Sequence, residues 1–421
     1  KLPGLNDTPA EINGDGRFRL PAYVYGEEKY IRYAGDRRSL MYPVDRSKLS
    51  EEPEERLLPN HLADNAGVAM LRSQGVDSAE EQYQAILSYG SHGIHHGHWD
   101  RLNLVYLRRF GKLATQTRTA WYSYGNHMYQ FYVQTSMAHS MVIVDSKNQY
   151  PAPSDQLLWH TGDLFQAVAV ENEARWSYPR FGRHLGYSEK EKEQGWLKTK
   201  AGRVTIPENP PEPGHMSEFT EPIRSRRLMA VTDEYVLVVD NVKGEEIHTF
   251  DPLFYFKGFK TYRNNDDVEL VEEREKFEDN PLSAGQFLTD ARIYQAQGTV
   301  KAEFVPKNGL VIDVYSAWPK QRQLVMSSNP HGWNAYSAGR SEASEASFVT
   351  LIELQENPAN RKVERVDADG PDKVKVTLAD GRTHKWQVEG LDAEQDRPSS
   401  VRLEMTEENA DGEQLREERA E

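Results

Sequence analysis

Cysteine is absent from the 421 residues of this chain. Its absence excludes disulfide bonds, thiolate zinc sites, iron–sulfur clusters and cysteine nucleophiles, and it leaves the cellular compartment open. Long apolar runs are missing too. None approaches the ~18 consecutive apolar residues of a membrane-spanning helix, so no membrane span is predicted.

Positive charge is also in short supply. The chain has 51 Lys and Arg against 66 Asp and Glu, which gives a net charge of −15. This balance disfavours non-specific nucleic-acid binding, so no nucleic-acid partner is predicted, and an anionic ligand would need a locally basic cleft. The first residue is Lys1, with neither an initiator methionine nor a signal-peptide pattern. We therefore expect the chain to be a piece of a longer precursor.

The rest of the composition is that of a globular protein, with 38% hydrophobic and 28% charged residues. At about 100–200 residues per domain, the length allows two or three domains. Residues 1–60 are rich in Pro, Gly and charge, and we interpret them as the tail of an upstream helical domain with a linker. Residues 61–355 are predicted to be an antiparallel β-sandwich, and residues 356–421 a small β unit with an acidic tail.

Short apolar or alternating runs carry the β prediction. Turn residues bound each run, and no helical pattern of about 10–15 residues alternates with them. This favours an antiparallel sandwich over a parallel α/β barrel. The runs are residues 67–72, 102–107, 141–144, 235–239, 309–314, 348–352, 374–378 and 401–405. Residues 407–421 are mostly acidic and are predicted to be a frayed tail.

The densest chemical signal is four histidines within residues 92–98, just before the run that begins at Leu102. Residues two apart on an extended segment face the same side, so His96 and His98 can point into one site. Imidazole suits both proton transfer and metal ligation. A solvated polar loop is the alternative interpretation. The His-Glu-x-x-His motif of zinc proteases is absent, and the helices that a metal-dependent amidohydrolase barrel needs are not predicted.

Residues 96–104 read His-Gly-His-Trp-Asp-Arg-Leu-Asn-Leu. This resembles the His-Gly-His-x-Asp-Lys-Leu-Asn-Leu signature of heparinase II/III-like polysaccharide lyases, and their oligo-alginate lyase branch most closely. Residues 135–145, with Gln149, resemble a second block of that family that contains Ala-His and Val-Asp. Residues 224–240 and 248–251 are weaker echoes. The resemblance covers roughly residues 60–355.

The resemblance implies an N-terminal (α/α) toroid followed by antiparallel β-sheets, with the active site between them, so most of the toroid would lie upstream of Lys1. It implies β-elimination at a 4-linked uronic acid of alginate, ulvan or glycosaminoglycan type. Its partner would be an anionic polysaccharide or oligosaccharide. The family acts on such polymers in the periplasm or outside the cell, so the chain is predicted to be periplasmic or secreted.

Site residues follow by position in that family. His96 would face the sugar and help neutralise the carboxylate or move a proton, and Tyr124 would act as base or acid. The substrate-binding candidates are Arg118, Arg101, Trp99 and His95. Arg suits a carboxylate because its fork binds both oxygens, whereas Trp99 could stack on a sugar face or pack in the core.

Members of the family often hold a structural zinc ion. The matching positions here are His98, Gln116 and His139, and an amide such as that of Gln116 is a poor zinc ligand. A hydrogen-bonded cluster of the three side chains without metal is the alternative. No other cofactor is predicted.

Two other functions stay open. A chain without its toroid could bind an anionic glycan without cleaving it, and a uronate C5-epimerase could use the same scaffold and residue types. A hydrolase is disfavoured, because no pair of carboxylates stands out. The sequence leaves the oligomeric state open, with a homodimer as one option.

Overall fold

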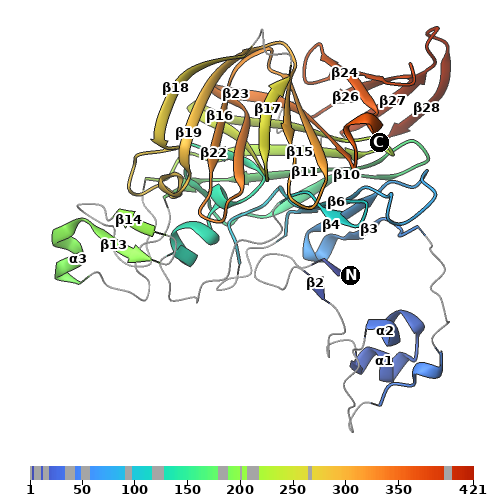
Figure 1. Cartoon of the computed structure of the whole chain (residues 1–421), viewed down its shortest axis with the longest axis horizontal. Helices are drawn as coiled ribbons and strands as arrows, with labels where there is room; N and C mark the ends of the chain where they lie inside the picture. The colour runs from blue at the N-terminus through green and yellow to red at the C-terminus, as the bar shows by residue number, and fades with distance from the viewer. Residues whose placement is uncertain are drawn as a thin grey trace.

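The computed structural model describes residues 2–3, 11–12, 19–33, 43–48, 57–90, 97–115, 128–178, 188–199, 202–205, 218–263, 268–392 and 401–421. These ranges are mainly β, and their strands pair in antiparallel ladders, which confirms the predicted fold class. Figure 1 shows one large sheet with a smaller sheet on each side.

The helices are few and short in this part of the chain. They are α1 (Arg19–Tyr25), α2 (Glu28–Tyr33) and α3 (Glu189–Gln194). α1 and α2 lie away from the sheets in Figure 1, and their assignment to the tail of a helical toroid stays a prediction. None of the described helices is long and apolar enough to cross a membrane.

Three groups of strands make up the layers. The large sheet runs in the order β10 (Ser154–Thr161), β11 (Gln166–Ala174), β15 (Ile223–Val231), β16 (Val236–Phe256), β23 (Asn334–Gln355), β21 (Val311–Trp318), β20 (Val300–Phe304) and β17 (Phe259–Arg263). Its side branches are β8 (Val142–Val144), β22 (Gln321–Ser328), β19 (Thr289–Gln297) and β18 (Val268–Lys276). The N-side sheet is β3 (His61–Ala63), β4 (Val68–Arg72), β5 (Gln84–Ser88), β6 (Asn103–Arg109) and β7 (Lys112–Leu113). The C-terminal sheet is β24 (Val363–Ala368), β25 (Lys373–Leu378), β26 (Thr383–Glu389), β27 (Arg402–Glu408) and β28 (Gln414–Ala420).

Short strand pairs complete the described chain. They are β1 (Leu2–Pro3) with β2 (Glu11–Ile12), β9 (Asn148–Gln149) with β12 (Trp176–Ser177), and β13 (Trp196–Thr199) with β14 (Gly202–Thr205).

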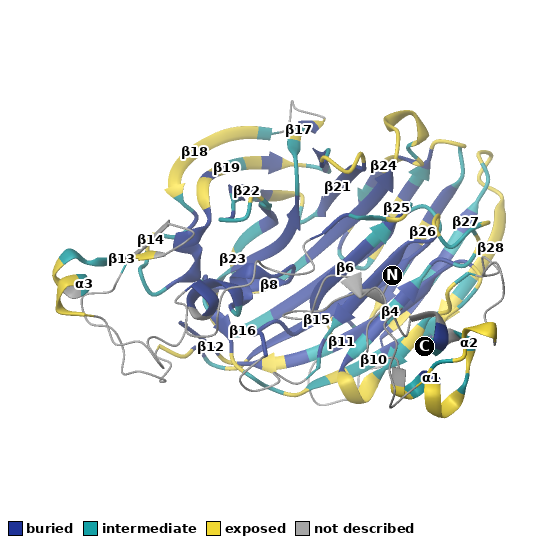
Figure 2. Ribbon diagram, turned by 60° about the horizontal axis from the view of Figure 1, so that its bottom comes forward, coloured by how far each residue is buried: buried dark blue, intermediate teal, exposed yellow. Residues whose placement is uncertain are grey.

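The continuous apolar run at residues 235–239 reflects burial on both faces of the large sheet. Val236 and Val238 belong to the core shared with the N-side sheet, whereas Leu237 and Val239 belong to the core shared with the C-terminal sheet. Successive side chains of a strand point to opposite faces, so a strand covered on both sides has no polar alternation. Figure 2 shows this buried interior in the middle strands.

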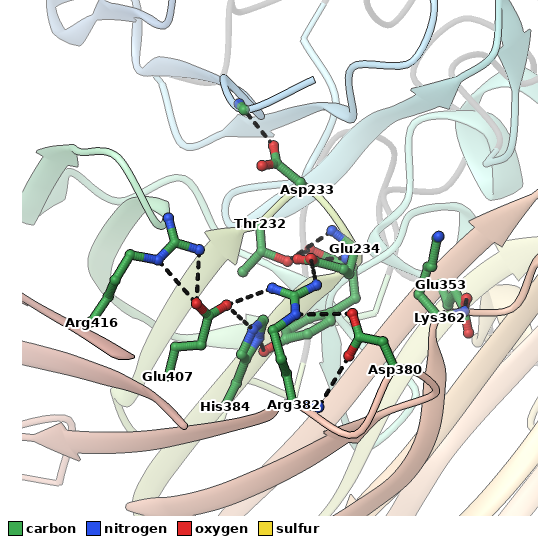
Figure 3. A network of polar contacts seen from close by, with 12 residues as sticks. Thr232, Asp233, Glu234, Glu353, Lys362, Asp380, Arg382, His384, Glu407 and Arg416 are labelled. Atoms are coloured by element: carbon green, nitrogen blue, oxygen red, sulfur yellow. Dashed lines mark hydrogen bonds and ion pairs between the residues drawn. The ribbon is translucent and has the colours of Figure 1, made fainter. Parts of the chain in front are cut away.

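A polar network joins the C-terminal sheet to the large sheet (Figure 3). Arg382 donates to Glu234 at 3.0 Å, to Asp380 at 2.9 Å and to Glu407 at 2.5 Å. Glu407 also accepts from Arg416 at 3.0 Å. Although burial raises the pKa of Glu407, the hydrogen bonds from Arg416 and Arg382 outweigh it and lower that pKa. The carboxylate therefore stays ionised and holds Arg382 in place, and Arg382 connects the two sheets through Glu234.

The prediction of a frayed tail at residues 407–421 is wrong. β28 forms the edge of the C-terminal sheet and pairs with β27. Glu418 on β28 accepts hydrogen bonds from the backbone N–H groups of Asp163 and Leu164 and contacts His160 at 2.7 Å. Ion pairs at a charged edge hold this strand although its sequence has few apolar residues.

Candidate functional site

The histidine motif enters the described structure at Gly97 and runs directly into β6. Gln134 donates to the carbonyl of Gly97 at 2.9 Å, and the N–H of Trp99 donates to the carbonyl of Gln134 at 2.9 Å. The segment that contains the second sequence block therefore fixes the backbone of the motif, 37 residues away in sequence.

His98 and His139 lie in direct contact and are both buried. Nδ1 of His98 is 2.9 Å from Nε2 of His139, and Nδ1 of His139 is 2.7 Å from the carbonyl oxygen of Thr135. A carbonyl only accepts, so Nδ1 of His139 carries the proton and donates. Burial lowers the pKa of His139. The neutral ring then accepts from Nδ1–H of His98, which leaves Nε2 of His98 as the basic nitrogen.

Asp100 lies beside this pair, with Oδ2 3.8 Å from Nε2 of His139. Asn103 donates to the same oxygen at 3.1 Å, and its own amide oxygen accepts from the N–H of Ser140 at 3.0 Å. Although burial raises the pKa of Asp100, the nearby histidines and this hydrogen bond lower it. The site therefore contains an ionised carboxylate beside two imidazoles.

Arg101 is the unusual member of the motif. Its side chain is 3% exposed, and Nε and Nη1 have no hydrogen-bond partner anywhere in the described ranges. It lines a cavity of about 420 Å³, whose other walls include Asp64, Tyr89 and Pro153. The hydroxyl of Tyr89 donates to Asp64 at 2.8 Å. A buried cation without a hydrogen-bonded partner is energetically costly.

The backbone after Arg101 is held in an uncommon conformation. Leu102 has a φ of 67°, in the left-handed region that bulky residues rarely adopt. Its carbonyl accepts from Nη1 of Arg227 at 2.8 Å. Arg227 also binds both oxygens of Asp240, at 2.6 and 3.0 Å, and both side chains are buried. This pair supplies the tertiary support that such a strained residue needs.

Sequence reasoning noted residues 224–240 only as a weak echo and gave Arg227 and Asp240 no role. The signal that could have found them is an arginine on one buried strand and an acidic residue directly after the apolar run 235–239 of the next strand, which antiparallel pairing places opposite each other. Asn103 and Gln149 lie in the two sequence blocks that carry the family resemblance, but the sequence assigned no role to their side chains. Gln149 accepts from the N–H of Arg101 at 3.1 Å.

Only part of the predicted site lies within the described structure. His95, His96, Gln116, Arg118 and Tyr124 lie outside the described residues. Their predicted roles therefore stay predictions.

Trp99 is described, and its side chain is 8% exposed. The stacking of Trp99 on a sugar stays a prediction, as does its alternative role in the core.

The weaker echo at residues 248–251 has a structural explanation. His248 is buried between two carboxylates, with Nδ1 2.8 Å from Asp145 and Nε2 2.8 Å from Glu221. Asp251 is buried and binds Arg340 and Ser337. These contacts connect β16 to its neighbours.

The described side chains do not by themselves form the predicted zinc site. No group of three or more His, Cys, Asp or Glu side chains within the described ranges is placed to hold a metal ion. His98 and His139 supply two imidazoles that already hydrogen-bond to each other. Structural zinc takes four ligands, so these two residues do not make a zinc site by themselves. A role for Gln116 stays a prediction.

Comparisons with known proteins add information on the fold. No family model matches the chain, and no curated protein matches it. A crystal structure of heparinase III matches with a TM-score of 0.53 at 14% identity, covering 91% of this chain and 50% of that one. The heparan sulfate lyase HepC from Pedobacter heparinus matches with a TM-score of 0.48 at 13% identity, covering 88% and 49%. The chain thus spans about half the length of these solved structures, and it has a heparinase III-like β fold.

Proposed function

We propose that this chain is the β part of a polysaccharide lyase that cleaves 4-linked uronic-acid polysaccharide by β-elimination. The observation that carries the proposal is Arg101, a buried guanidinium without a hydrogen-bond partner among the described residues, which lines a cavity beside the histidine motif. The heparinase III-like fold supports the scaffold. The proposed substrate is of the alginate, ulvan or glycosaminoglycan type, and the resemblance to oligo-alginate lyases rests on the signature residues alone.

The chemistry explains why such a site needs a cation. A base removes the C5 proton, the electron pair forms the C4–C5 double bond, and the O4 leaving group departs with a proton from an acid. The C5 proton is too weakly acidic while the adjacent carboxylate keeps its full charge. Arg101 would neutralise that carboxylate, and this stabilises the charge that develops in the transition state.

His96 and Tyr124 would move the two protons. His96 directly precedes Gly97, whose carbonyl is bound by Gln134. The buried His98–His139 pair then fixes the next turn of the chain. A rigid support of this kind is what a proton-transfer residue needs, because small displacements of the reacting atoms are costly in rate. Arg118 and His95 are proposed as further substrate contacts.

The test is an assay of the full-length natural protein on alginate, ulvan and heparan sulfate, with ultraviolet absorbance as the readout for the unsaturated product. His96→Ala, Tyr124→Phe and Arg101→Met should each lose the signal, while Arg365→Gln, an exposed change on β24, should keep it. Full activity in the first three variants would refute the proposal. Product formation from one polymer alone would identify the substrate.

A non-catalytic role in glycan binding is the second candidate, favoured by the buried cation of Arg101, which suits an anionic sugar whether or not the sugar is cleaved. Calorimetry that shows affinity for an anionic oligosaccharide without any unsaturated product would select it. Deuterium uptake at C5 without chain cleavage would instead select an epimerase.

Three further properties belong to the proposal. They are periplasmic or secreted location, a homodimer as one option, and a structural zinc ion. Cell fractionation, sedimentation and metal analysis of the purified protein test them in turn.

A further inference from the structure

The C-terminal sheet and the large sheet together line a second, larger cavity of about 770 Å³. One wall consists of side chains from β24, β25, β26 and β27. The opposite wall comes from the large sheet, through Gly298 and Thr299 between β19 and β20, Ala317 on β21, and Lys320 between β21 and β22. We call this cavity the lysine groove, after its members Lys320, Lys373, Lys375 and Lys385.

Strand register places the charged residues on one face. Lys375 pairs with Asp367 on one side and with Lys385 on the other, and Lys373 pairs with Gln387. The alternate residues Val374 and Val376 point the other way, into the core shared with the large sheet. Lys375 therefore has an acidic side chain directly opposite on one side and a basic one on the other, and these two neighbours act on the stability of the sheet in opposite directions.

Most charges in the lysine groove already have ionic partners. Its three carboxylates are each bound to a base: Asp369 to Lys320 at 3.4 Å, Asp367 to Arg365 at 2.8 Å and Glu404 to Arg419 at 2.8 Å. Lys385 is bound to Glu408.

Lys373 and Lys375 are different, since neither has an ion pair or hydrogen bond from its ammonium group within the described chain. Both side chains are exposed. The groove therefore presents two unpaired positive charges in a protein whose net charge is −15.

This pattern defines the ligand that the groove would accept. Two lysines two residues apart on a strand have their Cα atoms about 7 Å apart. Such spacing suits a chain of repeated anionic groups better than one small anion. Gln387, Thr406 and Thr299 line the same groove and supply neutral hydrogen-bonding groups for sugar hydroxyls. A cavity of this volume is within the range of small-molecule sites.

We propose that the lysine groove binds an acidic oligosaccharide, through Lys373 and Lys375, at a second site remote from the histidine motif. The substrate class follows from the proposed function, whereas the groove and its charges do not depend on it. Its role would be to hold one part of a long polymer while another part occupies the Arg101 cavity. Occupying two linked sites raises the affinity for long chains above that for short ones.

The experiment is a calorimetric titration of the chain with alginate-derived and heparan sulfate-derived oligosaccharides, with a neutral gluco-oligosaccharide of equal length as the control ligand. The double variant K373Q/K375Q should bind the acidic ligand about two- to thirtyfold more weakly, the combined range for two exposed charge contacts. The control variant K260Q/K307Q removes the same charge from exposed positions that do not line the groove, and it should bind as the parent does. Added salt should weaken binding by the parent.

Equal weakening in both double variants, or equal binding of the neutral ligand, would overturn the proposal. A second measurement keeps it separate from the lyase proposal. If the full-length protein forms no unsaturated product but K373Q/K375Q still loses affinity, the groove stands and the lyase does not. If product forms and K373Q/K375Q cleaves long and short substrates as the parent does, the lyase stands and the groove does not.

Discussion

Charged side chains at the two sheets that cover the large sheet differ in how they are partnered, as a network at one sheet and a single arginine at the other show. At the C-terminal sheet, Arg382 contacts three carboxylates, and Glu407 contacts two arginines. At the N-side sheet, the side chain of Arg101 is almost fully buried, yet Nε and Nη1 lack hydrogen-bond partners in the described chain. Ion-paired side chains can connect the layers of a fold, whereas a buried charge without a hydrogen-bonded partner indicates a binding site for a ligand. The comparison therefore distinguishes charged side chains that hold the sheets together from a charged side chain that is available to a ligand.

The largest effect is expected where a buried pair supports the motif. Arg227→Ala leaves Asp240 buried without its partner and removes the hydrogen bonds to Leu102 and Ser140. We expect the free energy of unfolding to fall by about 3–5 kcal/mol, measured by urea denaturation. The double variant Arg227→Met with Asp240→Leu should recover much of the loss. A loss below about 1 kcal/mol in the single variant would contradict this account.

The docking network of the C-terminal sheet should respond less. Arg382→Ala removes contacts to Glu234, Asp380 and Glu407. Arg416 still partners Glu407, so we expect a loss of about 1–3 kcal/mol. Arg365→Ala serves as the control, because its pair with Asp367 is exposed, and it should change stability by less than about 0.5 kcal/mol. Equal losses in the two variants would show that the network does not join the sheets.

The His248 contacts predict a stability profile with pH. Although burial raises the pKa of Glu221, the hydrogen bonds from His248 and backbone N–H groups lower it to about 2. Its contribution is therefore present above its usual pKa of 4.5 and is lost as the pH falls towards 2.

His248 has the opposite sign. Burial lowers its pKa, but the hydrogen bonds to Glu221 and Asp145 outweigh burial and raise it above 6.5. Its contribution is full below pH 6.5 and is lost as the pH rises through the folded-state pKa. The difference in unfolding free energy between the parent and His248→Gln should therefore be greatest between these limits, at about 1 kcal/mol after solvent screening. A difference that is flat from pH 3 to pH 9, about the range in which both groups titrate, would contradict the assignment.

The smallest effect on stability is expected for Arg101, whose Nε and Nη1 have no hydrogen-bond partner among the described residues. Arg101→Met removes a buried cation without breaking a side-chain hydrogen bond, so we expect a change within about 1 kcal/mol in either direction. Arg109→Met is the matched control. Arg109 is also buried on the N-side sheet, but its guanidinium donates to three backbone carbonyls, and its removal should cost about 2–3 kcal/mol. Similar losses in both variants would mean that Arg101 is part of the fold rather than a ligand contact.

Much of the β framework could be predicted from local patterns. The runs at residues 67–72, 141–144 and 374–378 each lie on a strand of the structure, since strand formation depends on neighbours two residues apart. The length of a strand was harder to predict from these patterns. β16 extends far beyond residues 235–239, through the polar residues Glu245 and Glu246, because it continues from one core into another.

For the candidate site, the sequence predicted the types of residue but not their contacts or burial. The family resemblance drew attention to His98 and His139, which are 41 residues apart and in contact. It did not show that Arg101 would be buried without a partner, because exposure depends on what the other sheets cover. The charged strand β28 was missed for the same reason, since its partners Asp163 and Leu164 are more than 250 residues away.

The amino-acid order by itself determined the location of several strand segments, which residues alternate, and that an acidic, cysteine-free chain carries a cluster of imidazoles. Only the tertiary structure decided which acidic side chain contacts which basic side chain. It gave Arg227 and Arg382 hydrogen-bonded carboxylates, whereas Arg101, Lys373 and Lys375 have no hydrogen-bonded carboxylate among the described residues. The physical reason is range: backbone geometry acts over a few residues, whereas the energy of a charge depends on every group that excludes water from it.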